Sequence, residues 1–497
     1  MKSCFHKLGY LRLDGRSVSL FRILLGVSIL YNLLFIKLPY TSQFWGEHTI
    51  IPVSVMQLMN GKDAFSIFDY VRNDFFAYGW MAVSILLAIL FTIGFYTQLV
   101  SFLLLFFYFN ILQAFSRYNP GFDKYTFQLL TWSCFLPLGN FFTISKTDIR
   151  KQIPLSVSVI LIVQLCWIYF CTGLAKYGDS WLNGYAVKIM ASDAWNASSL
   201  AAFFSDNSWV YKPLTYLTLF LEVAFPFLIL IPSHKDILKY IAVVFLMIFH
   251  GSIFLLTDVG NFSITGIAAA AVLLPASFWD RVGYKRSVSY FIPKYSKIKI
   301  AILTVLTAFV VYVISEKNIL FLTKNSAWRN SASANITSAI LQKTDIPVFI
   351  ENSFLFQNWK MFAPNPIMDA GWISIEYKGE DGLLYDLFTD EIVPVSRYKI
   401  NFQPKGMEMH LLSYARAMHN SDKWYTRVFV KYWYFYQLDI RKIPRNKYDN
   451  YFLAEYRYVI QPAEKSSVKN ITKQLYGYKA LESIATSLPA DFVKPVE

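Results

Sequence analysis

The chain has 497 residues, of which 55% are hydrophobic and only 16% are charged. Charged residues make up about a quarter of an average soluble domain, so this composition excludes an ordinary soluble protein and indicates a polytopic membrane protein. The formal net charge of +14 does not indicate a nucleic-acid partner, because the basic residues gather in short loops between apolar runs and no nucleic-acid-binding motif accompanies them.

Apolar runs close to the length of about 20 residues that spans a bilayer recur along the first 320 residues. They lie at 18–37, 76–96, 98–116, 125–142, 154–175, 213–232, 237–257, 260–279 and 299–316. The first run is long enough to span and lacks a small-residue cleavage site, so we expect a membrane helix and no signal peptide. The fourth run contains Pro137 and the eighth is rich in alanine, which makes them the weakest. We expect about 8–9 transmembrane helices.

The positions of Lys and Arg predict the orientation of the chain in the membrane. With nine spans, the loops on one side carry 15 basic residues, and the opposite loops and helix edges carry 8. Basic loops stay in the cytoplasm, so we expect a cytoplasmic N-terminus and an extracytoplasmic C-terminal part. The loop at 45–74 and the loop after Lys176 then both face outward, and loops of this length suggest a lid over a site at the level of the lipids.

The sequence after the last apolar run predicts a soluble domain. We expect residues 1–317 to form the transmembrane domain, and residues 318–497 to form an extracytoplasmic α+β domain with a small antiparallel sheet. Alternation in 372–388 around Glu380-Asp381-Gly382 predicts a hairpin. The β-prone residues of 427–440 predict a further strand.

Three other stretches of this domain also have expected structures. Helical spacing predicts helices at 406–420 and 470–486. The stretch from Met361 to Pro366 contains two prolines, which favour extended or turn structure. We expect it to be a structural turn that docks the soluble domain onto the membrane domain.

Lys176 ends the apolar run of 154–175 and is the residue that most needs an explanation. One interpretation is a lysine that reaches the membrane surface and anchors a helix end. The other is a lysine whose apolar surroundings lower its pKa, so that it serves as a base.

His250 and Glu222 lie within apolar runs, where ionisable side chains usually face the bundle interior. His250 is either a neutral packing residue or part of a site. Glu222 either pairs with Lys176 or His250, or is a protonated packing residue. No other ligands stand at metal-binding spacing, so we expect no metal.

Arg117, Asn119 and Asp123 surround a turn-forming Asn-Pro-Gly sequence between two apolar runs. A salt-bridged helix connection explains them. The functional alternative is that Arg117 or Asn119 stabilises a developing oxyanion.

The stretch GLAKYGDSWLNGY at 173–185 resembles the surroundings of the active-site lysine in the vitamin K-dependent γ-glutamyl carboxylases. In this resemblance Lys176 takes the place of the catalytic base, and Asp179 and Trp181 follow it in the loop.

Three further stretches resemble bacterial members of the wider horizontally transferred transmembrane (HTTM) domain family. They are SRYNPGFDKYTFQLLTWSCFLPLGNFF, VFLMIFHGSIFLLTDVGNFSITG and NWKMFAPNP with the GWISIEYKGEDGLLYDL that follows. The implied catalytic residues are Lys176 and His250. The implied substrate- or quinone-binding residues are Arg117, Asn119, Asp123, Asp179, Trp181 and Asn261.

This resemblance implies a lysine base that acts on reduced vitamin K or menaquinone, with coupled carboxylation of a protein glutamate. Such an enzyme belongs to the carbon–carbon lyase and quinone epoxidase type. The implied partners are membrane lipids, the quinone and a glutamate-bearing protein, with no nucleic acid, and the implied location is the bacterial inner membrane. The alternative is a non-catalytic scaffold that binds lipid or quinone. A transporter ranks third, because the paired broken helices of transporters are absent from the sequence.

Overall fold

The computed structural model of the chain describes residues 9–60, 65–116, 119–145, 150–151, 153–192, 197–198, 200–257, 259–284, 290–291, 361–366, 368–393, 424–460 and 468–484. The expected helices at 299–316 and 406–420, and the expected domain boundary after residue 317, lie outside these ranges.

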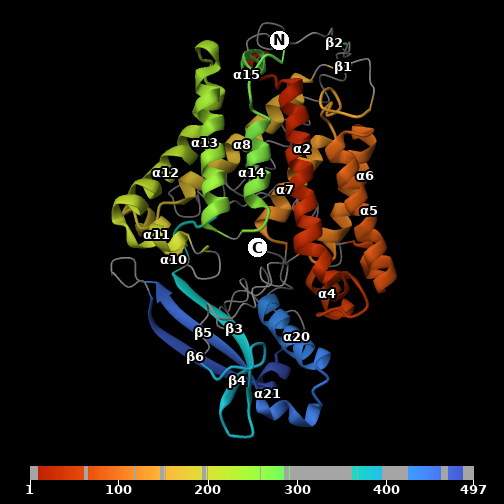
Figure 1. The fold of residues 1–497 in the computed structure, drawn as a ribbon, viewed down its shortest axis with the longest axis vertical. Coiled ribbons are helices and arrows are strands. Elements are labelled where there is room, and N and C mark those ends of the chain that lie inside the picture. The colour runs from red at the N-terminus through yellow and green to blue at the C-terminus, as the bar shows by residue number, and fades with distance from the viewer. Residues whose placement is uncertain are drawn as a thin grey trace, which may run out of the picture.

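Helices make up most of the first part of the chain, and Figure 1 shows them as a bundle of roughly parallel rods. They are η1 (Gly9–Leu11), α2 (Gly15–Tyr31), η2 (Asn32–Lys37), η3 (Leu38–Tyr40), α3 (Thr41–Trp45), α4 (Val53–Asn60), η4 (Ile67–Asp69), α5 (Asp74–Ile93), α6 (Thr97–Gln113), α7 (Gly121–Ser133), α8 (Leu155–Ala175), α9 (Asp179–Leu182), α10 (Ala186–Ser192), α11 (Ala201–Asp206), α12 (Ser208–Leu230), η6 (His234–Asp236), α13 (Ile237–Leu256), α14 (Phe262–Ala271) and α15 (Ala276–Arg281). A short parallel pair joins β1 (Arg150–Lys151) to β2 (Tyr290–Phe291).

Five helical segments among the described residues are long and apolar enough to cross a membrane. They are Gly15–Trp45, Asp74–Ile93, Leu155–Ala175, Ser208–Leu230 and Ile237–Leu256. The expected spans at 98–116 and 260–279 correspond to the shorter apolar helices α6 and α14. The expected span at 125–142 is also too short, because α7 ends at Ser133, before Pro137. The described residues therefore show a membrane protein but do not confirm 8–9 full spans.

Helix α14 is the short helix at the centre of the bundle, where it contacts α2, α7 and α13. Its alanines Ala268–Ala271 are fully buried. Small side chains let neighbouring helix backbones approach closely, which explains why an alanine-rich run with a weak membrane signal lies inside the bundle and does not face lipid.

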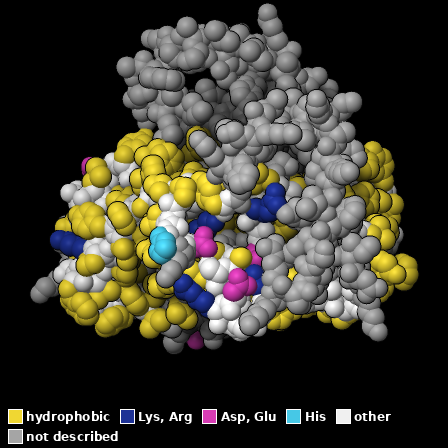
Figure 2. Space-filling view, turned by 90° about the horizontal axis from the view of Figure 1, so that it is seen from above, with side chains coloured by type: hydrophobic (Ala, Val, Ile, Leu, Met, Phe, Trp, Pro, Cys, Tyr) yellow, Lys and Arg dark blue, Asp and Glu magenta, His cyan; other side chains and the backbone are white. Residues whose placement is uncertain are grey.

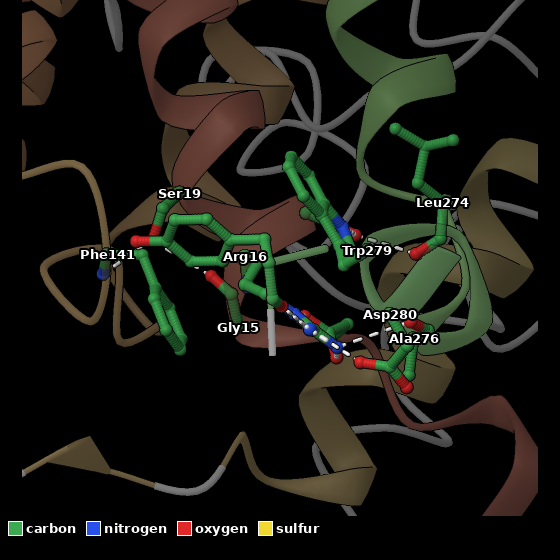
Figure 3. Close-up of polar contacts among 11 residues, drawn as sticks. Gly15, Arg16, Ser19, Phe141, Leu274, Ala276, Trp279 and Asp280 are labelled. Atoms are coloured by element: carbon green, nitrogen blue, oxygen red, sulfur yellow. Dashed lines mark hydrogen bonds and ion pairs between the residues drawn. The ribbon is translucent and has the colours of Figure 1, made fainter. Parts of the chain in front are cut away.

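Buried arginines hold together the end of the bundle that carries α15. Arg16 binds Asp14, and it also binds Asp280 at 2.8 Å and the Ala276 carbonyl at 3.3 Å (Figure 3). Arg22 donates to the carbonyls of Leu138 and Phe142 in the turn after α7. Figure 2, which views this end, shows charged side chains at its centre and hydrophobic side chains around its rim. Both arginines thus have structural partners.

The second part of the chain forms a four-stranded antiparallel sheet at the opposite end of the bundle (Figure 1). Its order is β4 (Leu384–Asp386), β3 (Asp369–Lys378), β5 (Tyr451–Ile460) and β6 (Val468–Gly477), with the helices α20 (Trp424–Ile440), η8 (Arg445–Asn450) and α21 (Tyr478–Glu482). The predicted hairpin is confirmed: β3 pairs with β4, and Gly382 has the positive φ of 83° that favours glycine in such a turn.

Two expectations for this part were wrong. Residues 427–440 lie in helix α20, because their buried side chains recur at helical spacing, as Val430, Trp433 and Tyr434 show. Apolar periodicity here outweighs the β propensity of individual residues. The stretch 470–486 forms most of strand β6 and only a short helix α21, because pairing with β5 extends to Gly477.

Candidate functional site

Lys176 is the first residue after α8, and it lies inside the protein. Its side chain is 3% exposed, and its ammonium forms an ion pair with Glu222 of α12. The Nζ atom also lies 4.8 Å from the centre of the Trp181 ring. Lys176 is therefore not the water-facing anchor that one interpretation of the sequence expected, and the alternative that paired Glu222 with Lys176 is confirmed.

The sequence around Lys176 explains how the pair forms. Gly173 lies one turn before Lys176 in α8, and a Cβ atom there would be 2.9 Å from Val223 and 3.0 Å from the Cβ of Glu222. The missing side chain thus lets α8 and α12 approach closely. Lys176 then leaves helical geometry at ψ 56°, which ends α8 beside the carboxylate.

Two opposing effects act on the charge of Lys176. Desolvation by the surrounding apolar side chains lowers the pKa of Lys176, and the neighbouring Glu222 carboxylate raises it in opposition. Desolvation is the larger effect, so the pKa of Lys176 lies below its ordinary value. The charged form thus depends on one buried partner.

Tyr169 and His250 form a second polar contact close to this pair. Tyr169 lies in α8, seven residues or about two helical turns before Lys176. Its hydroxyl is 2.6 Å from Nε2 of His250 in α13. The imidazole is fully buried against Gly266 of α14, where a Cβ would lie 2.2 Å from the ring. Its Nδ1 has no hydrogen-bond partner among the described residues.

A pocket between α8, α12 and α13 lies beside these groups. It is lined by Tyr169, Leu221, Glu222, Phe225, Leu228, Phe245, Leu246 and Phe249. The lining is thus apolar except for one carboxylate and one phenol. The outer faces of α12 and α13 expose large hydrophobic side chains, including Phe220 and Ile248, as lipid-facing helices do.

Asp123 and Asn261 belong to a different buried network. Asp123 binds the ammonium of Lys37 at 2.8 Å, and it accepts hydrogen bonds from Asn32 and Tyr108 at 3.0 and 2.9 Å. The Asn32 amide also donates to Asn261 at 3.1 Å. Neither Asp123 nor Asn261 lines the pocket, so the structure does not gather all expected site residues around one cavity.

A π-helical turn explains how Asn32 and Lys37 reach the same carboxylate. These residues begin and end η2, which continues from α2 with a wider winding. In an α-helix, residues five apart point about 140° away from each other, at 3.6 residues per turn. The wider π-helical turn brings them onto one face. Such turns often occur at functional sites, although here all of their polar groups find protein partners.

The remaining expected site residues lie in three kinds of surroundings. Trp181 is buried beside Lys176, and its indole N–H donates to the Phe362 carbonyl at 2.8 Å. Asp179 is exposed. Asn119 is buried and donates to the Leu112 carbonyl at 2.7 Å, while its Oδ1 has no partner among the described residues. Arg117 lies outside the described residues.

Tyr169, Lys37, Asn32 and Tyr108 are buried polar residues that sequence reasoning did not assign to a site. A tyrosine in an apolar run is common, and only the spacing of seven between Tyr169 and Lys176 hints at a shared face. Lys37 stands at the end of an apolar run, as Lys176 does, so the same argument from a buried cation would have found it. Among the described residues, no three His, Cys, Asp or Glu side chains are placed to hold a metal ion.

A family model described as the HTTM domain matches residues 10–279. This stretch covers more than half of the 497 residues and contains both buried lysine pairs, the pocket and His250. No curated protein and no solved structure matches the chain. The chain is a membrane protein that belongs to the HTTM domain family.

Proposed function

We propose that this chain is a membrane enzyme of the vitamin K-dependent γ-carboxylase type, in which Lys176 accepts a proton from a reduced membrane quinone. The observation that supports this most is the buried Lys176–Glu222 pair, whose carboxylate borders an apolar pocket. HTTM membership and the resemblance around Lys176 support the proposed type of reaction.

Glu222 gives Lys176 a route to the neutral form that a base requires. A buried ammonium and carboxylate are both costly to desolvate, and transfer of one proton from Nζ to the carboxylate removes both charges at once. The neutral amine then accepts a proton from a bound hydroxyl at Nζ. Apolar walls keep water from competing for this proton, and a base matched to the working pH contributes about 10²–10⁴-fold to such a step.

The side chains that line the pocket have the chemistry expected of a site for a lipid quinone, but the cavity itself measures only about 10 Å³, so these side chains must part for a quinone ring to enter. Phe225, Phe245 and Phe249 offer flat apolar surfaces, while Tyr169 and Glu222 supply polar atoms for a ring oxygen. When bound, reduced vitamin K or menaquinone supplies an acidic ring hydroxyl and reactivity toward oxygen. Nδ1 of His250 has no partner among the described residues, and this imidazole contacts Tyr169 but does not line the pocket.

The proposal includes an orientation and a substrate. We infer a cytoplasmic end at α15 and an extracytoplasmic sheet, in the inner membrane of a bacterium. The basic loops and the opposite positions of these two ends support this orientation (Figure 1). Lys176 then lies near the outer surface, where a protein glutamate arrives for carboxylation. Of the residues that the resemblance assigned to substrate binding, Asn119, whose Oδ1 has no partner among the described residues, remains a candidate.

The test is the consumption of reduced menaquinone or vitamin K with oxygen by the purified protein in lipid nanodiscs. We expect product in the wild type, and a rate about 10²–10⁴-fold lower in Lys176→Gln. The matched control is Lys447→Gln, which makes the same change at an exposed lysine of η8. Quinone binding without turnover in all three proteins would instead support the non-catalytic scaffold.

A further inference from the structure

Residues Met361–Pro366, here called the strap, contact the loop that follows Lys176. The Gly178 N–H donates to the Pro364 carbonyl at 3.1 Å. The Ser180 N–H donates to Oδ1 of Asn365 at 2.9 Å. These two bonds confirm that the strap docks onto the membrane domain.

The fit between strap and loop is close. A Cβ atom on Gly178 would lie 2.2 Å from Oδ1 of Asn365 and 2.4 Å from its Cγ and Nδ2 atoms. Glycine at 178 thus leaves the space that the Asn365 side chain fills. Because Gly178 and Ser180 lie two and four residues after Lys176, the strap sets the path of the chain directly beyond the lysine.

Trp181 connects the strap to the ammonium itself. Its indole N–H donates to the Phe362 carbonyl at 2.8 Å, and its ring lies 4.8 Å from Nζ of Lys176. Trp181 is 1% exposed, so its contact with Nζ lies inside the protein. An indole ring fixed at one edge by a hydrogen bond has a defined face to offer a cation.

We propose that the strap positions Lys176 for reaction, with Asn365 fixing the loop and the Phe362 carbonyl fixing Trp181. Asn365 is a positioning residue, since it touches the loop and not the lysine. This inference rests on the proposed function of Lys176, and it adds that the site is completed by a segment far away in the sequence.

The strap also links the site to the C-terminal sheet. Strand β3 begins at Asp369, three residues after Pro366, and it pairs on both sides with other strands of the sheet. A shift of the sheet therefore moves the strap, and with it the loop and the Trp181 ring that the strap holds beside Lys176. The lysine site is thereby mechanically coupled to the C-terminal part of the chain.

The experiment measures the modification of Lys176 by a water-soluble amine-reactive acetylating reagent, quantified by mass spectrometry in the full-length protein. Asn365→Ala removes the acceptor for Ser180, and Gly178→Ala pushes against the same side chain. We expect each change to raise Lys176 modification about fivefold, the effect of losing roughly one hydrogen bond from the closed state. The double variant should show less than the product of both effects, because Asn365→Ala removes the clash.

Two controls separate a displaced strap from a loosened protein. Lys37 is an equally buried lysine with its own acid, so its modification in the same sample reports general loosening. Asn450→Ala makes the matched change at an exposed asparagine of the C-terminal part and should leave Lys176 unchanged. An unchanged ratio of Lys176 to Lys37 modification in both strap variants would overturn the proposal. This holds whether the modification of both lysines stays low or the modification of both rises by the same factor.

Turnover provides the second readout. In Asn365→Ala we expect a lower kcat for the reduced quinone and an unchanged KM, because the pocket between α8, α12 and α13 is untouched. Wild-type protein without turnover would refute the proposed function, while the modification ratio would still decide whether the strap covers Lys176.

Discussion

Two lysine–carboxylate pairs are buried among the described residues of the bundle, and their surroundings differ. Asp123 accepts hydrogen bonds from Lys37, Asn32 and Tyr108, so both of its oxygens are occupied. Glu222 accepts from Lys176 alone among the described residues, and it borders the pocket. The first pair is enclosed by further hydrogen-bond donors of the protein. In the second pair Lys176 and Glu222 bind each other, and the apolar pocket lies next to the carboxylate.

Under the proposed function, this difference separates a structural ion pair from a reactive one. A buried charge with several fixed partners is held in its charged form, because each hydrogen bond favours that form. Glu222 accepts hydrogen bonds from Lys176 alone among the described residues, so proton transfer within this pair leaves no other donor without its acceptor. We therefore assign the Lys37–Asp123 network to the stability of the bundle and the Lys176–Glu222 pair to proton transfer.

Removal of either acid alone gives the largest expected loss of stability. Asp123→Leu and Glu222→Leu each leave a lysine buried without its partner, which costs about 3–5 kcal/mol. We expect Asp123→Leu to be the worse of the two, because it also strands the donors of Asn32 and Tyr108. Unfolding in mixed micelles with increasing denaturing detergent measures both. Equal losses of stability in the two variants would contradict the structural distinction between the pairs.

Tyr169 and Tyr108, one buried tyrosine from each network, give a smaller, matched comparison. Tyr169→Phe leaves His250 without its hydroxyl partner, and Tyr108→Phe removes one of three donors to Asp123. Each change should cost about 1–3 kcal/mol in the same unfolding experiment. Only Tyr169→Phe should also slow quinone turnover, since only Tyr169 lines the pocket. Slower quinone turnover in Tyr108→Phe as well would show that both networks contribute to the reaction, which contradicts this comparison.

Asp179→Asn should have the smallest effect. The side chain is exposed, and surface substitutions usually change stability by less than about 0.5 kcal/mol. We expect quinone turnover within about twofold of the wild type. A larger fall in turnover at unchanged stability would return Asp179 to the site that the family resemblance implied for it.

Sequence reasoning found the parts of the structure that local chemistry determines. The apolar runs and the turn at Gly382 follow from composition and backbone preference, and Lys176 and Glu222 were both recognisable as ionisable residues in apolar runs. It failed for 427–440, where the helical spacing of the apolar residues outweighs their β propensity. It also failed for 470–486, where pairing with β5 extends the strand to Gly477. It also could not separate the two networks, because the π-helical turn that directs Asn32 and Lys37 toward Asp123 has no clear sequence signal.

The most direct test replaces each pair as a whole and compares quinone turnover. Lys37→Met/Asp123→Leu and Lys176→Met/Glu222→Leu each exchange a buried ion pair for apolar side chains, a change that is often neutral for stability. With both proteins folded, we predict turnover close to wild type in the first and a loss of about 10²–10⁴-fold in the second. Equal turnover in the two proteins would contradict the assignment of Lys176 and Glu222 to proton transfer.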